Sequence, residues 1–161
     1  MEPCLSLALL ADSMGLVINL VALSTDFWIE VVGPIAIHAG LWLKGPVEDY
    51  IHVTQGFSIS AALLSLVALI FLVWSFIPLL TAPAHSLLVS TKTAFAAALC
   101  MIVAMSVYTS ENLHKRVHSQ LQVSFGWSFY LGWISAILLL FAGALSLAAH
   151  CGSRRAEYRS I

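Results

Sequence analysis

Four continuous apolar runs dominate the sequence and set its fold class. Each run has 20 to 25 residues, enough to cross about 30 Å of hydrocarbon as a helix rising 1.5 Å per residue. Lipid offers no hydrogen-bond partners to the backbone, so each run must be helical. The predicted spans are residues 4–24, 57–77, 89–108 and 125–149.

The composition excludes the main alternatives. Residues of the AVILMFWYC set make up 60% of the 161 residues, and only 9% are charged, against about 25% in an average soluble domain. A short soluble chain could not bury that much apolar surface. A β-barrel would need alternating segments. Seven basic residues face eight acidic ones with no basic run, so no nucleic-acid partner is expected.

An even number of spans places both termini on one side of the membrane. We expect one tetraspan domain over residues 1–161, an all-α membrane fold with a cytosolic loop at 78–88 and a cytosolic tail at 150–161. The outer loops are 25–56 and 109–124. The termini side carries four Lys or Arg residues against three on the other side, which favours cytosolic termini.

Small and aromatic residues predict how the spans pack. Gly132 and Ala136 lie four apart, a spacing that lets helices approach closely, either within the bundle or between copies. Aromatic residues gather at the outer end of the fourth span, as in an interfacial belt or a specific lipid or partner site. They are Trp127, Phe129, Tyr130 and Trp133.

Asp12 is the polar exception within the first span, and Asn19 lies seven residues later on the same helical face. A carboxylate inside the membrane is costly and usually faces the bundle. It could serve a proton or ion relay. Because the membrane holds no second charged group, we favour a protonated or hydrogen-bonded packing residue paired with a neighbouring Ser, Thr or Asn.

The first outer loop contains a motif that resembles a known family. β-Branched residues at Val31–Val32 and Ile51–Thr54 favour short strands. Trp28 follows the first span, and Gly40, Leu41 and Trp42 follow about a dozen residues later. This pattern resembles the peripheral myelin protein, epithelial membrane protein and claudin tetraspan family. The resemblance implies a left-handed four-helix bundle topped by a small extracellular or luminal β-sheet from the first loop.

The cysteines depart from that family pattern. The family places a disulfide-forming cysteine pair after Gly-Leu-Trp, whereas here Lys44 follows and the outer loops contain no cysteine. Cys4 and Cys151 lie at the predicted cytosolic membrane edge, where they could be S-palmitoylated or inert. Cys100 lies within the third span, and we interpret it as a packing residue.

Four further blocks and the chain end resemble the members of this family that reside in cytolytic granules. That resemblance implies a role in lysosome-related granules of killer lymphocytes, where such proteins support granule exocytosis and target-cell killing. The blocks are residues 22–28, 50–55, 107–110 and 127–133, together with the ending from residue 149.

The tail offers a sorting signal. Tyr158 and Ile161 form a Tyr-x-x-bulky apolar pattern that ends the chain, similar to signals read by clathrin adaptors. An extended segment of this kind can add to a sheet edge, with pockets for both side chains. The adaptor is cytosolic, which agrees with the orientation. An unread tail is the alternative.

No catalytic constellation is present, so we expect no enzyme activity and no cofactor. Four histidines fall in the outer loops and would gain charge in an acidic lumen, but they do not predict a metal site. The partners expected are membrane lipids, a clathrin adaptor and an unidentified membrane protein. Alternatives to a granule protein are a claudin-like adhesion protein and an auxiliary subunit of a channel or proton pump. The four histidines are His38, His52, His114 and His118.

Overall fold

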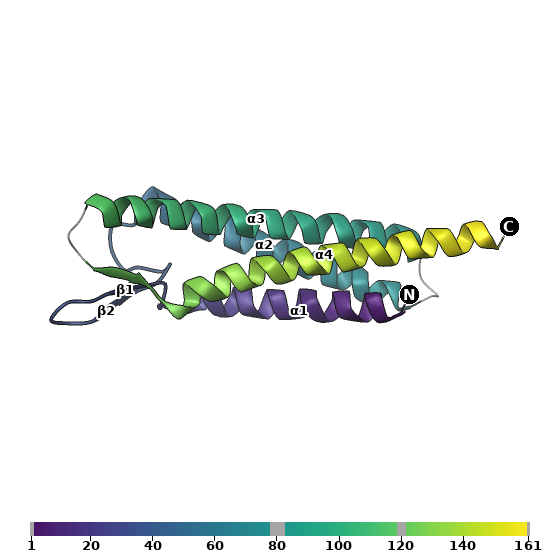
Figure 1. Cartoon of the computed structure of the whole chain (residues 1–161), viewed down its shortest axis with the longest axis horizontal. Coiled ribbons are helices and arrows are strands. Elements are labelled where there is room, and N and C mark those ends of the chain that lie inside the picture. The colour runs from purple at the N-terminus through teal and green to yellow at the C-terminus, as the bar shows by residue number, and fades with distance from the viewer. Residues whose placement is uncertain (1, 78–82, 119–121, 161) are drawn as a thin grey trace.

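The chain forms an elongated bundle of four helices with a small sheet at one end (Figure 1). The computed structural model describes residues 2–77, 83–118 and 122–160. All four helices are long and apolar enough to cross a membrane, by length and composition. The described part of the chain contains α1 (Glu2–Ser24), β1 (Ile29–Val31), β2 (Ile37–Ala39), α2 (Asp49–Ser75), α3 (Pro83–His118), β3 (Val123–Phe125) and α4 (Trp127–Arg159).

The helices pack in the order α1, α2, α3, α4 around the bundle, with the closest pairs being α1 with α4 and α2 with α3. Their interior positions recur at alternating intervals of three and four residues, the heptad spacing of left-handed packing. Those of α2 show it most regularly. They are Ile51, Thr54, Ser58, Ala61, Ser65, Ala68 and Leu72.

Small residues fill most of these interior positions, so the helices approach closely. Gly132 of α4 faces Met105 of α3, where an added Cβ would lie 2.5 Å from the sulfur. Gly143 faces the ring of Phe95 in the same pair of helices. The small-residue stripe that includes Gly132 and Ala136 therefore packs within the bundle of a single chain.

The sheet combines both outer loops. β1 lies in the centre, antiparallel to β2 and to β3. Ile29 pairs with Ala39 on one side and with Phe125 on the other. The sheet lies at the end of the bundle opposite the two termini (Figure 1).

The structure confirms the fold class and differs from the sequence prediction in local detail. Ile51–Thr54 lies in α2 rather than in a strand, because Ile51 and Thr54 occupy interior positions at helical spacing. The sheet is not built from the first loop alone, since β3 comes from the second outer loop. Phe125, predicted to begin the fourth span, pairs in β3.

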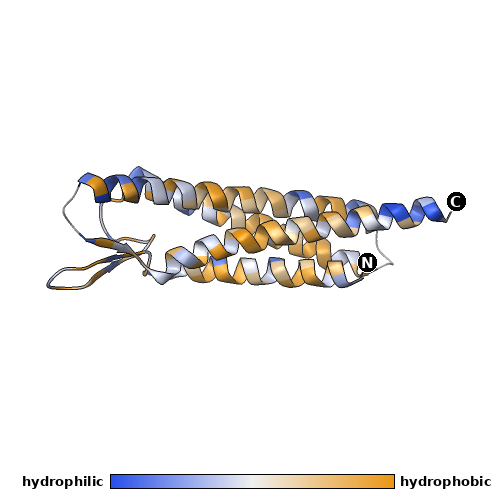
Figure 2. Ribbon diagram, in the orientation of Figure 1, coloured by the Kyte–Doolittle hydropathy of each residue, from blue (hydrophilic) through white to orange (hydrophobic). Residues whose placement is uncertain are grey.

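The helices also extend beyond the predicted spans. α2 begins at Asp49, eight residues before the predicted start, and α3 continues to His118. α4 continues to Arg159, through most of the segment predicted as a cytosolic tail. Figure 2 shows the chain turning hydrophilic along this part of α4, which projects past the bundle. Loss of hydropathy ends a span but does not end a helix.

Candidate functional site

Trp28 forms the centre of the contact between the sheet and the bundle. Its side chain is fully buried. The indole N–H donates to the carbonyl oxygen of Ala22 over 2.7 Å. The ring meets Tyr108 of α3 with centroids 4.9 Å apart and planes at 65°, an edge-to-face geometry that aromatic pairs favour. Trp28 thus joins α1, β1 and α3.

The loop returns to the C-terminal end of α1 at Gly40, Leu41 and Trp42. A Cβ on Gly40 would lie 2.5 Å from Asp26 Oδ1 and 2.6 Å from Asp26 Cα, so the two backbones meet too closely for any larger residue. Leu41 is fully buried, and its carbonyl oxygen accepts a bond from Gln55 Nε2 at 2.5 Å. Trp42 is 53% exposed and donates its indole N–H to Leu23 O over 2.8 Å.

These contacts cap the C-terminal end of α1. The last carbonyls of a helix have no partner within the helix. Here Thr25 Oγ1 donates to Val21 O at 2.8 Å, Trp28 to Ala22 O and Trp42 to Leu23 O. The motif Trp28, Gly40, Leu41, Trp42 therefore acts as a structural clamp. It holds the loop by hydrogen bonds and burial in a chain whose three cysteines are all free.

Asp12 and Asn19 of α1 face α2. Asp12 is fully buried and accepts a hydrogen bond from Ser65 Oγ at 2.6 Å. Asn19 is also buried, and its Nδ2 donates to Ser58 O at 3.1 Å. Ser65 is a neighbour of the kind that the packing interpretation of Asp12 requires.

The polar contacts of Asp12 and Asn19 lie too far apart along the bundle to form one site. Seven helical residues separate Asp12 from Asn19, about 10 Å along the axis. Between them Ser135 Oγ of α4 donates to Gly15 O at 2.8 Å. Gly15 and Ser135 were not predicted from the sequence, although the position of Gly15 midway between two polar residues was the available signal. The geometry is that of a polar seam tying α1 to α2 and α4.

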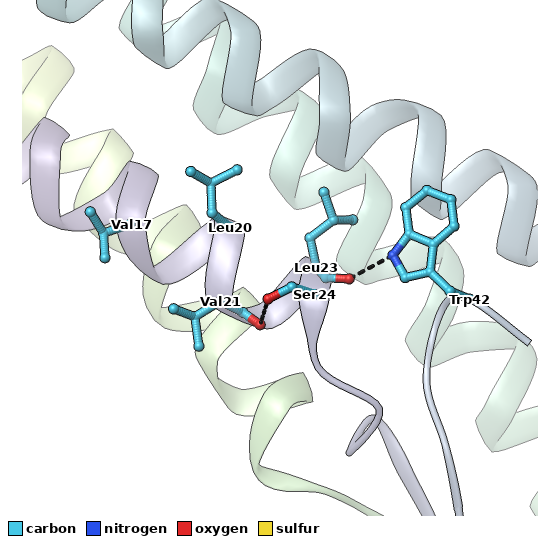
Figure 3. A pocket seen from close by; sticks show the side chains of 6 residues that line it. All are labelled: Val17, Leu20, Val21, Leu23, Ser24 and Trp42. Atoms are coloured by element: carbon cyan, nitrogen blue, oxygen red, sulfur yellow. Dashed lines mark hydrogen bonds between the residues drawn. The ribbon is translucent and has the colours of Figure 1, made fainter.

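A hollow runs along the lipid-facing side of α1 near its C-terminal end (Figure 3). It has a volume of about 490 Å³. Trp42 lies at one end of the hollow, where its indole N–H bonds to Leu23 O, and Val17 lies at the other (Figure 3). The lining residues are Val17, Leu20, Val21, Leu23, Ser24 and Trp42.

The predicted aromatic belt divides into an outer and an inner part. Trp127 and Tyr130 are exposed on the side of α4. Phe129 is buried and stacks on Phe125 with centroids 4.1 Å apart, while Trp133 packs against the core around Trp28. Only the outer residues have the exposure that an interfacial belt requires.

The termini end of the bundle carries the residues predicted for lipidation and sorting. Cys4 is half-buried against the cluster of Ala8, Leu72, Leu87 and Ala149, whereas Cys151 is exposed. Tyr158 is 77% exposed on the last turn of α4. Ile161 lies outside the described residues.

The outer histidines lie at the sheet end. The rings of His114 and His118 are tilted by 38° with centroids 4.5 Å apart, and His38 Nδ1 lies 4.0 Å from Glu30 Oε1. His52 bonds to Gln55 at 3.2 Å. Within the described residues, no three His, Cys, Asp or Glu side chains are grouped so that they could hold a metal ion.

Known proteins match this chain over its full length. The chain is 58% identical to human (Homo sapiens) Protein NKG7, 56% to the Mus musculus protein and 51% to the Bos taurus protein, each over 100% of both chains. These matches confirm the narrower resemblance predicted from the sequence blocks. The chain is also 26% identical to the Homo sapiens lens fiber membrane intrinsic protein, over 85% of this chain and 86% of that one.

A family described as PMP-22/EMP/MP20/Claudin matches residues 4–146, a range that reaches into all four helices and includes the clamp. With relatives above 50% identity over the full length, the chain belongs to the PMP-22/EMP/MP20/claudin family of tetraspan membrane proteins.

Proposed function

We propose that this tetraspan protein resides in the membrane of cytolytic, lysosome-related granules and promotes their exocytosis, and thereby lymphocyte cytotoxicity. The observation that carries the proposal is the full-length identity of 58% with human Protein NKG7. The sequence blocks resemble natural killer cell granule protein 7, and that resemblance implies the granule membrane and, after fusion, the plasma membrane.

The protein acts through partner membrane proteins rather than by catalysis. The described residues present a bundle interior closed by small side chains, in which Asp12 bonds to Ser65 and Ser135 bonds to Gly15 between helices. What the chain offers to the outside is apolar lateral surface, including the hollow beside α1 (Figure 3). Lateral contact within the membrane is the interaction that such a surface supports.

The termini face the cytosol in this proposal. Arg154, Arg155 and Arg159 extend from α4, and cytosolic segments next to spans carry an excess of basic residues. Tyr158 is accessible to an adaptor on the exposed end of this helix. Because adaptors bind such signals in extended form, the last turn of α4 must unwind before binding.

An auxiliary subunit of a channel or proton pump is the second candidate function. It is favoured by α1, which is the least covered of the four helices and leaves its apolar side open to a larger partner. In this case granule pH or ion content would change first, and exocytosis only as a consequence.

The test is deletion of the protein in cytotoxic lymphocytes with two readouts. We expect reduced surface appearance of a granule membrane marker after stimulation, while luminal pH measured with a ratiometric dye stays normal. Re-expression of the full chain should restore degranulation. Normal degranulation in the deleted cells would contradict the proposal, and an altered resting luminal pH would favour the auxiliary-subunit function.

A further inference from the structure

The apex of the β1–β2 hairpin is an exposed apolar tip. Residues 32–38 are all exposed, and three large aliphatic side chains lie among them. From Val31 to Ile37 the sequence reads Val-Val-Gly-Pro-Ile-Ala-Ile, so no side chain there carries a charge or forms hydrogen bonds. The exposed fractions are 62% for Val32, 76% for Ile35 and 58% for Ile37.

The base of the hairpin is well supported. β1 pairs on both sides, with Val31 opposite Ile37 in β2 and opposite Val123 in β3. Below it, Trp28 N donates to Ala39 O at 3.2 Å, and the Trp28 ring is buried against the bundle. The apex is therefore held out by ordered strands, and its exposure does not result from a loose loop.

The hairpin points away from the membrane that the bundle spans. Figure 1 shows that β1 and β2 project beyond the helices, along the long axis of the molecule, at the end opposite the termini. Figure 2 shows both apolar and hydrophilic colour along this projecting part of the chain. The apex therefore cannot shelter in the protein's own bilayer, and a second surface facing the membrane is within its reach.

The chemistry of the apex favours lipid over a protein partner. Protein interfaces are anchored by Trp, Tyr and Arg and oriented by hydrogen bonds, and residues 31–37 contain none of these side chains. A convex aliphatic tip needs only a fluid apolar phase. The apolar hollow beside α1 of a second copy lies at the depth of the spans, between Val17 and Trp42, where an apex on the aqueous side does not reach.

We propose that the β1–β2 apex inserts into the surface of an apposed lipid bilayer. Insertion buries Val32, Ile35 and Ile37. Glu30 and His38, which lie 4.0 Å apart at the base, stay at the level of the headgroups. About three residues separate apex from base on each strand, so the apex enters by roughly 10 Å, to the boundary of headgroups and acyl chains.

The experiment uses the full chain in phosphatidylcholine nanodiscs, mixed with protein-free phosphatidylcholine vesicles and separated by flotation. Wild-type nanodiscs should float with the vesicles. Ile35→Asp should reduce the bound fraction about tenfold or more, because it replaces a buried aliphatic group by a charge. Val32→Asp, on the other side of Gly33 and Pro34, should also reduce the bound fraction.

Val117→Asp is the matched control. Val117 is 83% exposed in the last turn of α3, at the same end of the molecule but outside the hairpin. This variant should bind vesicles as wild type does. Equal binding by wild type and Ile35→Asp would overturn the proposal. So would wild-type binding that requires anionic lipid and is lost in salt, or binding that requires the chain in both membranes.

Discussion

The indole of Trp28 and the phenol ring of Tyr108 meet edge to face with centroids 4.9 Å apart, and this contact joins the outer sheet to the third helix. The same indole bonds to the last turn of α1 through Ala22 O. One side chain therefore fixes the loop to two helices that are distant in sequence. The family motif is explained by this capping and burial.

Removing the Trp28 side chain should destabilise the protein strongly. Trp28→Ala leaves a large cavity and should cost about 3–5 kcal/mol of unfolding free energy. Trp28→Phe keeps most of the packing but leaves Ala22 O with only the long 3.4 Å bond from Thr25 Oγ1, at a cost of about 1–3 kcal/mol. Thermal unfolding in detergent measures both. Trp42→Phe is the comparison: Trp42 is 53% exposed, so the loss of its bond to Leu23 O should lower the melting temperature less than Trp28→Phe does.

Two glycine substitutions should have opposite effects. Gly40→Ala places a Cβ 2.6 Å from the backbone Cα of Asp26, so the loop must shift and the protein is destabilised. Gly56→Ala lies in α2 with no heavy atom within 4 Å, and it should stabilise the helix by about 0.5–1 kcal/mol. Both variants are compared by melting temperature. A gain in stability from Gly40→Ala would refute the close approach.

The bond between Asp12 and Ser65 is testable by a double-mutant cycle. Asp12→Ala and Ser65→Ala should be less destabilising together than the sum of the two single changes, with a coupling of about 0.5–1.5 kcal/mol. Unfolding in detergent mixtures gives the four free energies. Ser60→Ala is the control, since Ser60 is exposed on α2 and bonds only to its own helix at Gly56 O. Additive changes would mean that the side chains of Asp12 and Ser65 do not interact.

The tail should control where the protein resides. Tyr158→Ala removes the exposed ring of the sorting signal, so the protein at steady state should shift from granules to the cell surface. Surface labelling with an antibody to a tag in an outer loop gives the ratio of protein at the cell surface to protein in granules. Glu157→Ala, a change outside the Tyr-x-x-bulky apolar pattern, should leave the distribution as it is. An unchanged distribution for Tyr158→Ala would show that the tail is not read.

The sequence predicted the four helices and the motif but not the local structure around them. Apolar runs in α1 to α4 are long enough that hydropathy alone identifies them. Ile51–Thr54 misled the strand prediction because β-branched residues also occur on buried helix faces, where packing overrides propensity. The third strand, Val123–Phe125, has only three residues and pairs with a segment more than ninety positions earlier, a relationship that no local pattern contains.

For the candidate site too, the sequence predicted individual residues but not their partners. The sequence indicated Asp12 and Asn19 as polar residues within a span, and Trp28 as part of the family motif. It could not indicate their partners, because Ser65, Ser58 and Ala22 O are ordinary groups that become specific only when the helices pack.

The most direct test of the account is immunogold electron microscopy of cytotoxic lymphocytes that express the chain with an epitope inserted after Gly45. That position lies in the outer loop, with no heavy atom within 4 Å of its Cβ site. The account predicts label on the luminal side of perforin-containing granules at rest and on the outer cell surface after stimulation. Label confined to cell–cell contacts, or on the cytosolic face of granules, would contradict it.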